Sequence, residues 1–157
     1  MTQYNVYALG NALVDIECEV SPDLLQGLRI DKGVMTLIDE DHHHEILNQL
    51  NSHPLKRASG GSAANTVIAV SQFGGKAFYS CKVADDEPGQ FYLNDLLANG
   101  VDTNLQVHAP EPGVTGKCLV FVTPDADRTM TTFLGISGGL SDAELVPEAI
   151  AESAYTY

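Results

Sequence analysis

Two polar residues interrupt an apolar segment near the start of the chain, in the sequence GNALVD at residues 10–15. An ionised Asp15 can accept hydrogen bonds from two adjacent hydroxyl groups, and the amide of Asn11 can both donate and accept. The pair therefore suits the diol of a ribose or a hexose. Alternatively, Asn11 makes a turn and Asp15 is a solvated strand residue, and these residues alone leave both interpretations open.

A glycine-rich turn, GGSAAN at residues 60–65, precedes a segment with the apolar spacing of a helix. Gly60 and Gly61 let the backbone approach a ligand closely, and the free N–H groups of a first helical turn favour oxygen acceptors. A tight turn that needs a positive φ would also account for the two glycines. It does not account for Asn65, because asparagine is a mediocre residue inside a helix and its amide gains most by facing a polar ligand.

The run HHH at residues 42–44, between Asp41 and Glu45, invites a metal-site interpretation. Consecutive helical residues point about 100° apart and cannot converge on one tetrahedral ion. We therefore predict no metal site, and we interpret the run as the solvated first turn of a helix.

The three cysteines, Cys18, Cys81 and Cys118, match neither a zinc pattern nor a disulfide framework. We expect reduced thiols in a cytoplasmic protein. Alternation along its strand predicts that Cys118 is a small hydrophobic residue facing a pocket or the core, rather than a reactive thiol.

The charge balance is strongly acidic, with 8 Lys and Arg residues against 21 Asp and Glu residues in 157, a formal net charge of -13. Nucleic-acid binding is not expected, because no basic stripe is present to neutralise phosphates. No segment approaches the roughly 18 apolar residues of a membrane span, and the N-terminus lacks an export signal. A hydrophobic content of 44% is enough for one domain with a core of its own.

Hydrophobic patterning predicts the elements that must position these residues. A buried central strand is expected over 4–9, followed by a strand over 13–20 with alternate residues on one face. Further strands are predicted at 34–38 and 77–83. Helices are predicted from Asp23, after Ser21-Pro22, to near Arg29, from Asp39 or Asp41 to Leu50, and over 62–73 and 86–97. This alternation favours a parallel sheet with crossover helices.

The pattern changes after residue 115. Segments 116–123 and 128–134, joined by turn residues 124–127, predict a hairpin that belongs to an antiparallel, half-exposed sheet. Ser141 and Glu144 fit a capping box ahead of a final helix. Residues 154–157 resemble the start of a strand, and a strand followed by neither turn nor cap suggests a polypeptide cut inside its fold.

Taken together, these blocks resemble the ribokinase-like (PfkB-type) carbohydrate kinases. The resemblance spans nearly the whole chain. It rests on GNALVD, the GGSAAN turn with its helix and the following FGG, CKVADDEPG at residues 81–89, and the pair Thr115-Gly116. GNALVD with the later TGKC at residues 115–118 is more similar to the adenosine kinase branch than to ribokinase itself.

The resemblance implies an α/β, ribokinase-like fold, with a mainly parallel sheet flanked by helices and a small antiparallel β lid, incomplete in this chain. Residues 1–157 would form the N-terminal part of a single domain, with lid strands at about 13–20, 34–38, 115–123 and 128–134. The residues that would bind the hydroxyl groups of a small-molecule sugar or nucleoside are Asn11, Asp15, Gly60, Gly61 and Asn65. Arg128 resembles an arginine that reaches from the lid toward ATP, although a solvated turn arginine is an equal alternative.

The activity implied is ATP-dependent phosphorylation of a primary hydroxyl of a sugar or an adenosine-like nucleoside. In the family, a G-x-G-D turn supplies the anion hole and the catalytic Asp, and this chain has none. Gly138-Gly139-Leu140-Ser141-Asp142 imitates it but lacks the spacing. We therefore assign no catalytic residue, expect ATP and Mg²⁺ to bind mainly through a C-terminal half, and expect this chain alone to be inactive.

Two other functions remain to be weighed. The chain could be a non-catalytic fragment that acts as a sugar-binding module or forms a homodimer through the lid. A dinucleotide-binding oxidoreductase is disfavoured, because no G-x-G-x-x-G follows the first strand.

Overall fold

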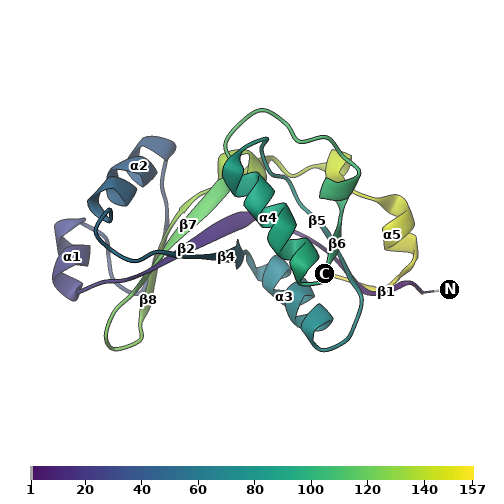
Figure 1. Cartoon of the computed structure of the whole chain (residues 1–157), viewed down its shortest axis with the longest axis horizontal. Coiled ribbons are helices and arrows are strands. Elements are labelled where there is room, and N and C mark those ends of the chain that lie inside the picture. Colours follow the sequence, from purple (N-terminus) through teal and green to yellow (C-terminus); the bar gives the residue numbers. More distant parts are fainter. Residues whose placement is uncertain (1) are drawn as a thin grey trace.

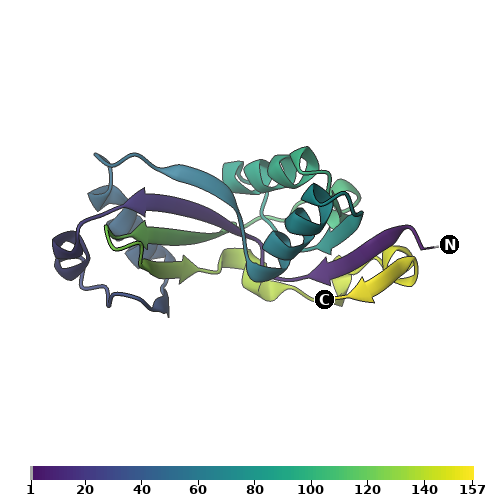
Figure 2. The same ribbon diagram turned by 90° about the horizontal axis from the view of Figure 1, so that it is seen from below.

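Two β-sheets lie end to end along the long axis of the molecule, with helices at both ends (Figures 1 and 2). The structure is a computed structural model and describes residues 2–157. We call the sheet near the N-terminus of the chain the core sheet, with strand order β6-β5-β1-β9. We call the other sheet the lid sheet, with strand order β3-β8-β7-β2-β4.

The core sheet is parallel throughout. The interior strand β1 (Tyr4–Leu9) pairs with β5 (Ala77–Ser80) on one side and with β9 (Ser153–Thr156) on the other. The short strand β6 (Asp102–Thr103) follows β5 at one edge. The predictions of a buried central strand over 4–9 and of a strand at the end of the chain are confirmed, whereas β6 was not predicted.

Helices cover both faces of the core sheet. Helices α3 (Ser62–Gln72) and α4 (Glu87–Ala98) contribute Val67, Tyr92 and Leu96 to the main hydrophobic core, together with Ala8 and Tyr79 of the strands. Helix α5 (Pro147–Ala151) packs its Ala149 against Tyr7 and Phe78 on the opposite face. The sheet with its crossover helices is the parallel α/β arrangement that the sequence predicts.

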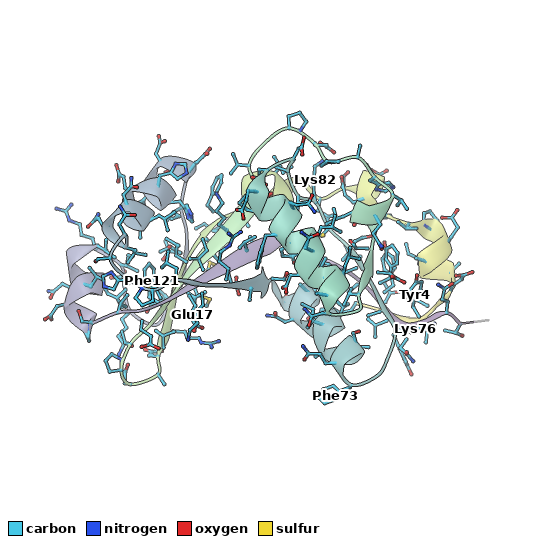
Figure 3. The ribbon with its side chains drawn as sticks, in the orientation of Figure 1. Tyr4, Glu17, Phe73, Lys76, Lys82 and Phe121 are labelled. Carbon is cyan, nitrogen blue, oxygen red and sulfur yellow. The ribbon has the colours of Figure 1, made fainter. Side chains whose placement is uncertain are left out.

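Helix α3 ends where expected, and the aromatic residue at its C-cap, Phe73, is not buried. Gly74 follows the C-cap residue with φ +87°, a conformation that glycine adopts without strain. Phe73, which continues the apolar spacing of α3, is 91% exposed and points away from the fold (Figure 3).

The lid sheet has five strands: β2 (Leu13–Glu19), β3 (Met35–Leu37), β4 (Lys56–Gly60), β7 (Gly116–Val122) and β8 (Arg128–Phe133). The predicted hairpin of β7 and β8 is present, with Ala126 in the turn at φ +63°. Strand β4 was not predicted, because its sequence KRASG has no apolar alternation.

The lid sheet is mixed, which corrects the expectation of an antiparallel lid. Strands β2 and β4 are antiparallel, as are β7 and β8, but β2 with β7 and β3 with β8 are parallel. The reason is the chain path: Leu13 and Gly116, the first residues of β2 and β7, are paired at the core end, so both strands run outward from it.

Helices α1 (Pro22–Gly27) and α2 (Glu40–Gln49) lie at the far end of the molecule beside the lid sheet (Figure 1). Their buried residues Leu25, Ile46 and Leu50 join the same hydrophobic cluster as Val14 and Phe121 of the lid strands. Asp39 is the N-cap of α2, and its side chain accepts a hydrogen bond from the His42 N–H at 2.8 Å.

The expectation of a solvated histidine run is wrong for the middle residue. His42 and His44 are exposed, but His43 is fully buried, and its ring lies 6.2 Å from that of Phe133 of β8. The helical period explains the difference, because His43 lies three residues before the buried Ile46 on the same side of α2.

The last segment departs from the prediction in one detail. Ser141 and Glu144 do form a capping box, but on the short 3₁₀ helix Asp142–Glu144. Helix α5 begins later, with Pro147 at its first turn and no side-chain cap. None of the helices within residues 2–157 has the length and apolar character needed to cross a membrane.

Candidate functional site

The glycine turn at residues 60–61 lies where the lid sheet meets the core. Strand β4 ends at Gly60, and Gly61 is the N-cap of α3 with φ +98°. A Cβ on Gly60 would overlap the Asp15 carboxylate, and a Cβ on Gly61 would lie 2.6 Å from the Asn11 carbonyl oxygen. Only glycine allows this close approach, so the structure brings together the two sequence blocks that contain Asn11, Asp15, Gly60 and Gly61.

Asp15 occupies a half-buried position on β2, opposite Ala58 of β4 and Cys118 of β7. Within residues 2–157, its carboxylate accepts no hydrogen bond from protein atoms. Burial raises the pKa of Asp15 to about 6, the charge of Arg128 opposes this rise, and the charge of Glu17 adds to it. Asp15 is therefore a carboxylate without a protein partner, next to backbone that has no side chain.

The two asparagines are both exposed. Asn11 lies in the connection from β1 to β2, and its carbonyl faces Gly61. Asn65 lies in the first turn of α3, where its backbone N–H donates to the Gly61 carbonyl at 3.0 Å. Both amides thus border the same turn and are free to contact a ligand.

Arg128 is placed at the outer end of β8 rather than in this turn. It pairs in register with Val122, four residues beyond the Cys118 that lies opposite Asp15, or about 13 Å along the strand. Its guanidinium lies 3.6 Å from a carboxylate oxygen of Glu17 and is largely exposed. Glu17 lies on the lid sheet next to this arginine, toward the outer end of the molecule (Figure 3).

A row of residues crosses the lid sheet at the level of Asp15. In register, Asp15 is followed by Cys118 of β7, Thr132 of β8 and Leu37 of β3. Strand alternation places this row on the face opposite Val14 and Phe121, which we call the open face of the lid sheet. The Thr132 hydroxyl lies 3.4 Å from the Cys118 sulfur, and burial raises the pKa of this thiol.

The open face carries apolar residues on β7 and β3, whereas β2 places Glu17 and Glu19 on it. Val120 and Cys118 are buried, whereas Met35 is 55% and Leu37 is 60% exposed. The expectation that Cys118 behaves as a small hydrophobic residue facing a pocket or the core agrees with its burial. Thr132 and Leu37 were not named from the sequence, although alternation along β8 and β3 could have identified them.

Asp86 fixes the beginning of β7 to the core. One of its carboxylate oxygens accepts from the Gly89 N–H of α4 at 2.8 Å and the other from the Thr115 N–H at 2.9 Å. The buried Thr115 hydroxyl donates to Asp86 and accepts from the Ala84 N–H at 2.9 Å. The sequence indicated Asp86 only as a helix cap, because its contact with Thr115 joins residues 29 positions apart.

Comparisons with known proteins point to one protein family. Residues 30–157 match the family described as pfkB family carbohydrate kinase. Adenosine kinase from Sinorhizobium meliloti, which has a crystal structure, is 38% identical in sequence to this chain. The match covers 99% of this chain and has a TM-score of 0.86. A probable sugar kinase protein from Rhizobium etli CFN 42 is 34% identical, covers the whole chain and gives a TM-score of 0.91.

A curated relative, 5-dehydro-2-deoxygluconokinase of Geobacillus kaustophilus, is 30% identical over 93 residues, which are 59% of this chain and 27% of that protein. The chain covers 46% and 47% of the two solved structures, so it spans less than half the length of these relatives. The family match covers most of the chain and the structural matches cover all or nearly all of it, with the same parallel sheet and mixed sheet. The chain therefore belongs to the pfkB family of carbohydrate kinases and has the ribokinase-like fold.

Proposed function

We propose that the whole protein transfers the γ-phosphoryl group of ATP to a primary hydroxyl of a sugar or nucleoside, and that this chain supplies the acceptor pocket and the lid. The observation that carries the proposal is the Asp15 carboxylate, which is half-buried, accepts no hydrogen bond from residues 2–157 and lies against Gly60. The carboxylate is partly open to solvent, so acceptor hydroxyl groups could replace the water that solvates it in the free protein.

The proposed role of Asp15 is to accept hydrogen bonds from two neighbouring hydroxyl groups of the acceptor. Hydrogen bonds to a charged group are worth about 1.5–3 kcal/mol each, and they favour the ionised carboxylate. Asn11 and Asn65 would add amide donors and acceptors from the two sides of the glycine turn. Gly60 and Gly61 would let the Asp15 carboxylate and the Asn11 backbone lie directly against the turn, since neither glycine has a side chain.

A nucleoside of the adenosine type fits the site better than a free sugar. The open face of the lid sheet continues from Asp15 into apolar side chains, including Cys118 and Leu37. A free sugar bound to Asp15 through its diol would leave this apolar surface uncovered. The flat base of a nucleoside, attached to the bound sugar, would cover the surface. A relative similar to 99% of this chain is an adenosine kinase, which supports the same choice.

The residues of this chain do not by themselves fit a nucleotide and its metal ion. Within residues 2–157 no three side chains of His, Cys, Asp or Glu are grouped to hold a metal. Arg128 is the only residue that we assign to ATP, and its present partner is Glu17. We propose that ATP and Mg²⁺ bind mainly to the part of the relatives that this chain does not cover, and we assign no catalytic residue here.

The test is a screen of the whole protein for ATP-dependent phosphorylation of adenosine, ribose, fructose and ketodeoxygluconate. We expect turnover with one of these acceptors, adenosine first, and a loss of about 100-fold or more in kcat/KM for Asp15→Asn, because two charge-assisted bonds are weakened. Glu19→Gln, at an exposed residue on the same strand face, is the matched control. A folded protein without turnover on any acceptor would refute the proposal.

A second candidate function is a non-catalytic module that binds a sugar or forms a homodimer through the lid. The observation in its favour is the edge strand β3, where Met35 and Leu37 are exposed, as is Val34 just before the strand. Exposed apolar edge strands tend to pair with another chain. Light scattering of this 157-residue chain discriminates: a monodisperse dimer with affinity for a sugar supports the module, and a monomer or an aggregate argues against it.

A further inference from the structure

Helix α4 contacts the last residues of β4 along one side of the helix. Glu87, Phe91 and Asp95 are spaced four residues apart, and Tyr92 follows Phe91, so all four face the same neighbouring strand. Arg57 of β4 donates to both carboxylate oxygens of Glu87, at 2.9 and 3.1 Å, and lies 4.3 Å from the centre of the Phe91 ring. The hydrogen bonds between Arg57 and Glu87 are exposed, whereas the contacts nearer the glycine turn are buried or partly buried.

The inner contacts hold residues 59 and 60. The Tyr92 hydroxyl donates to the Gly60 carbonyl at 2.8 Å, and an Asp95 carboxylate oxygen accepts from the Ser59 N–H at 3.0 Å. Strand β4 is an edge strand of the lid sheet, so the Ser59 N–H points away from β2 and needs a partner outside the sheet. One helix therefore binds a backbone donor and a backbone acceptor on adjacent residues.

Tyr92 is fully buried, and its bond persists across the working pH range. Burial raises the pKa of Tyr92 well above its ordinary value, with a further contribution from the neighbouring Tyr79. The hydroxyl therefore stays protonated and remains a donor. Because the peptide unit is planar, fixing the Gly60 carbonyl also fixes the direction of the Gly61 N–H.

We propose that Tyr92 and Asp95 are positioning residues that hold the Ser59-Gly60 backbone against the Asp15 carboxylate and so set the shape of the acceptor site. The inference rests on the proposed function, since it assumes that Asp15 binds the acceptor. Neither residue touches the acceptor. Tyr92 acts through the Gly60 carbonyl and Asp95 through the Ser59 N–H, and the missing Cβ of Gly60 leaves the space that Asp15 fills.

The proposal is tested with a double-mutant cycle of Tyr92→Phe and Asp15→Asn in the whole protein. The dissociation constant for adenosine is measured by titration calorimetry and kcat is measured separately. We expect Tyr92→Phe to weaken adenosine binding about fivefold, the equivalent of one lost hydrogen bond, with a smaller effect on kcat. In the Asp15→Asn background the same substitution should weaken binding less than about twofold, because Tyr92 acts through Asp15.

Tyr7→Phe is the matched control. Tyr7 is also fully buried, and its hydroxyl is 2.6 Å from the Ser80 hydroxyl, but it lies on the α5 side of the core sheet. The Tyr7→Phe variant should bind adenosine as tightly as the wild type does. Asp95→Asn provides a second variant if Tyr92→Phe does not fold, and we expect it to show the same dependence on Asp15.

The outcomes separate the two proposals. If Asp15→Asn leaves adenosine binding unchanged, the proposed acceptor site itself is wrong. If Asp15→Asn weakens binding but Tyr92→Phe and Asp95→Asn have no effect, or have the same effect in both backgrounds, the positioning role alone is refuted.

Discussion

At the scale of single residues, Asp15 combines its proposed role in acceptor binding with a cost to stability. Its carboxylate is half-buried beside Gly60 and accepts no hydrogen bond within the described residues 2–157, so burial raises its pKa from 3.8 to about 6. A group whose pKa is raised in the folded state favours folding only while it is protonated. The free protein therefore carries a charged group above pH 6 that a bound acceptor would satisfy.

Asp15→Asn should stabilise the free protein at pH 8. The unfolded Asp15 releases its proton near pH 3.8 and the folded one near pH 6, so wild-type stability falls as the pH rises through this interval. We expect a gain of about 1–2 kcal/mol, reduced from the full shift because the carboxylate is partly open to solvent. Urea unfolding at pH 8 and pH 4 measures the difference, which should be much smaller at pH 4 because most of the shift lies above that pH. A variant that is less stable at pH 8 would contradict the assigned environment.

Gly61→Ala should destabilise the protein and weaken acceptor binding together. Gly61 has φ +98°, and an added Cβ would lie 2.6 Å from the Asn11 carbonyl oxygen, so the turn must move. We expect a loss of about 2–3 kcal/mol in the free energy of unfolding. Gly27→Ala in α1 is the control, because its Cβ meets no atom within 4 Å, and it should be neutral or slightly stabilising. Equal effects of the two substitutions would argue against a constrained turn.

The residues of the site differ in how far the sequence could reveal them. Asp15, Gly60 and Gly61 were predicted, because an acidic residue after a buried strand and two glycines before a helix are local signals. Tyr92 and Asp95 were not, because each looks like an ordinary residue of an amphipathic helix. Their contacts with residues 59 and 60 depend on the packing of α4 against β4, which no local pattern contains.

At the scale of elements, the side of α2 that packs against the lid sheet includes a buried histidine without hydrogen-bond partners. His43 is fully buried, and neither ring nitrogen has a hydrogen-bond partner in the described part of the chain. Burial lowers the pKa of His43 to about 4, and the charges of Lys117 on β7 and of His44 add to the effect. Protonation of His43 therefore opposes the docking of α2.

His43→Leu should remove this dependence on pH. The unfolded histidine takes up a proton near pH 6.5 and the folded one only near pH 4, so the wild type loses stability as the pH falls through this interval. We expect the variant to gain on the wild type by on the order of 3 kcal/mol between pH 7 and pH 4. Urea unfolding of both proteins across this range measures it. His42→Gln changes an exposed histidine of the same turn, and its stability should depend on pH as that of the wild type does. If the stability of His43→Leu also depends on pH in the same way as that of the wild type, the account is refuted.

The elements that the sequence missed share a physical cause. Strand β4 has the sequence KRASG, with three exposed residues, and forms because Ser59 and Gly60 pair with β2 and bind α4. Strand β6 has two residues and forms by pairing with β5. Partners distant in the sequence create both strands, whereas β1, β2 and α3 have apolar patterns of their own and were predicted within a few residues.

At the scale of the whole molecule, the lid sheet and the core are joined by closely packed backbone. A Cβ on Gly116 would lie 2.6 Å from the Leu134 carbonyl oxygen and 2.9 Å from that of Ala12, so the connections to β2, β7 and β8 meet at one place. Asp86 and Thr115 add hydrogen bonds there. The proposed acceptor site lies beside this junction, where the ends of the core strands meet the lid (Figure 1).

The architecture was predictable mainly because it resembles a known family. Patterning alone indicated parallel strands, crossover helices and a separate hairpin, but it could not decide that β2 and β7 run side by side. That arrangement follows from two connections that both leave the core at the same junction. It also determines that Asp15 and Cys118 are neighbours, and hence that the carboxylate proposed to bind the acceptor lies beside apolar side chains.

The most direct test of the central claim is a crystal structure of the whole protein with adenosine bound. The account predicts both ribose hydroxyls within hydrogen-bonding distance of the Asp15 carboxylate, and the base on the open face of the lid sheet near Cys118. Adenosine bound elsewhere, with Asp15 contacting only solvent or protein, would contradict it.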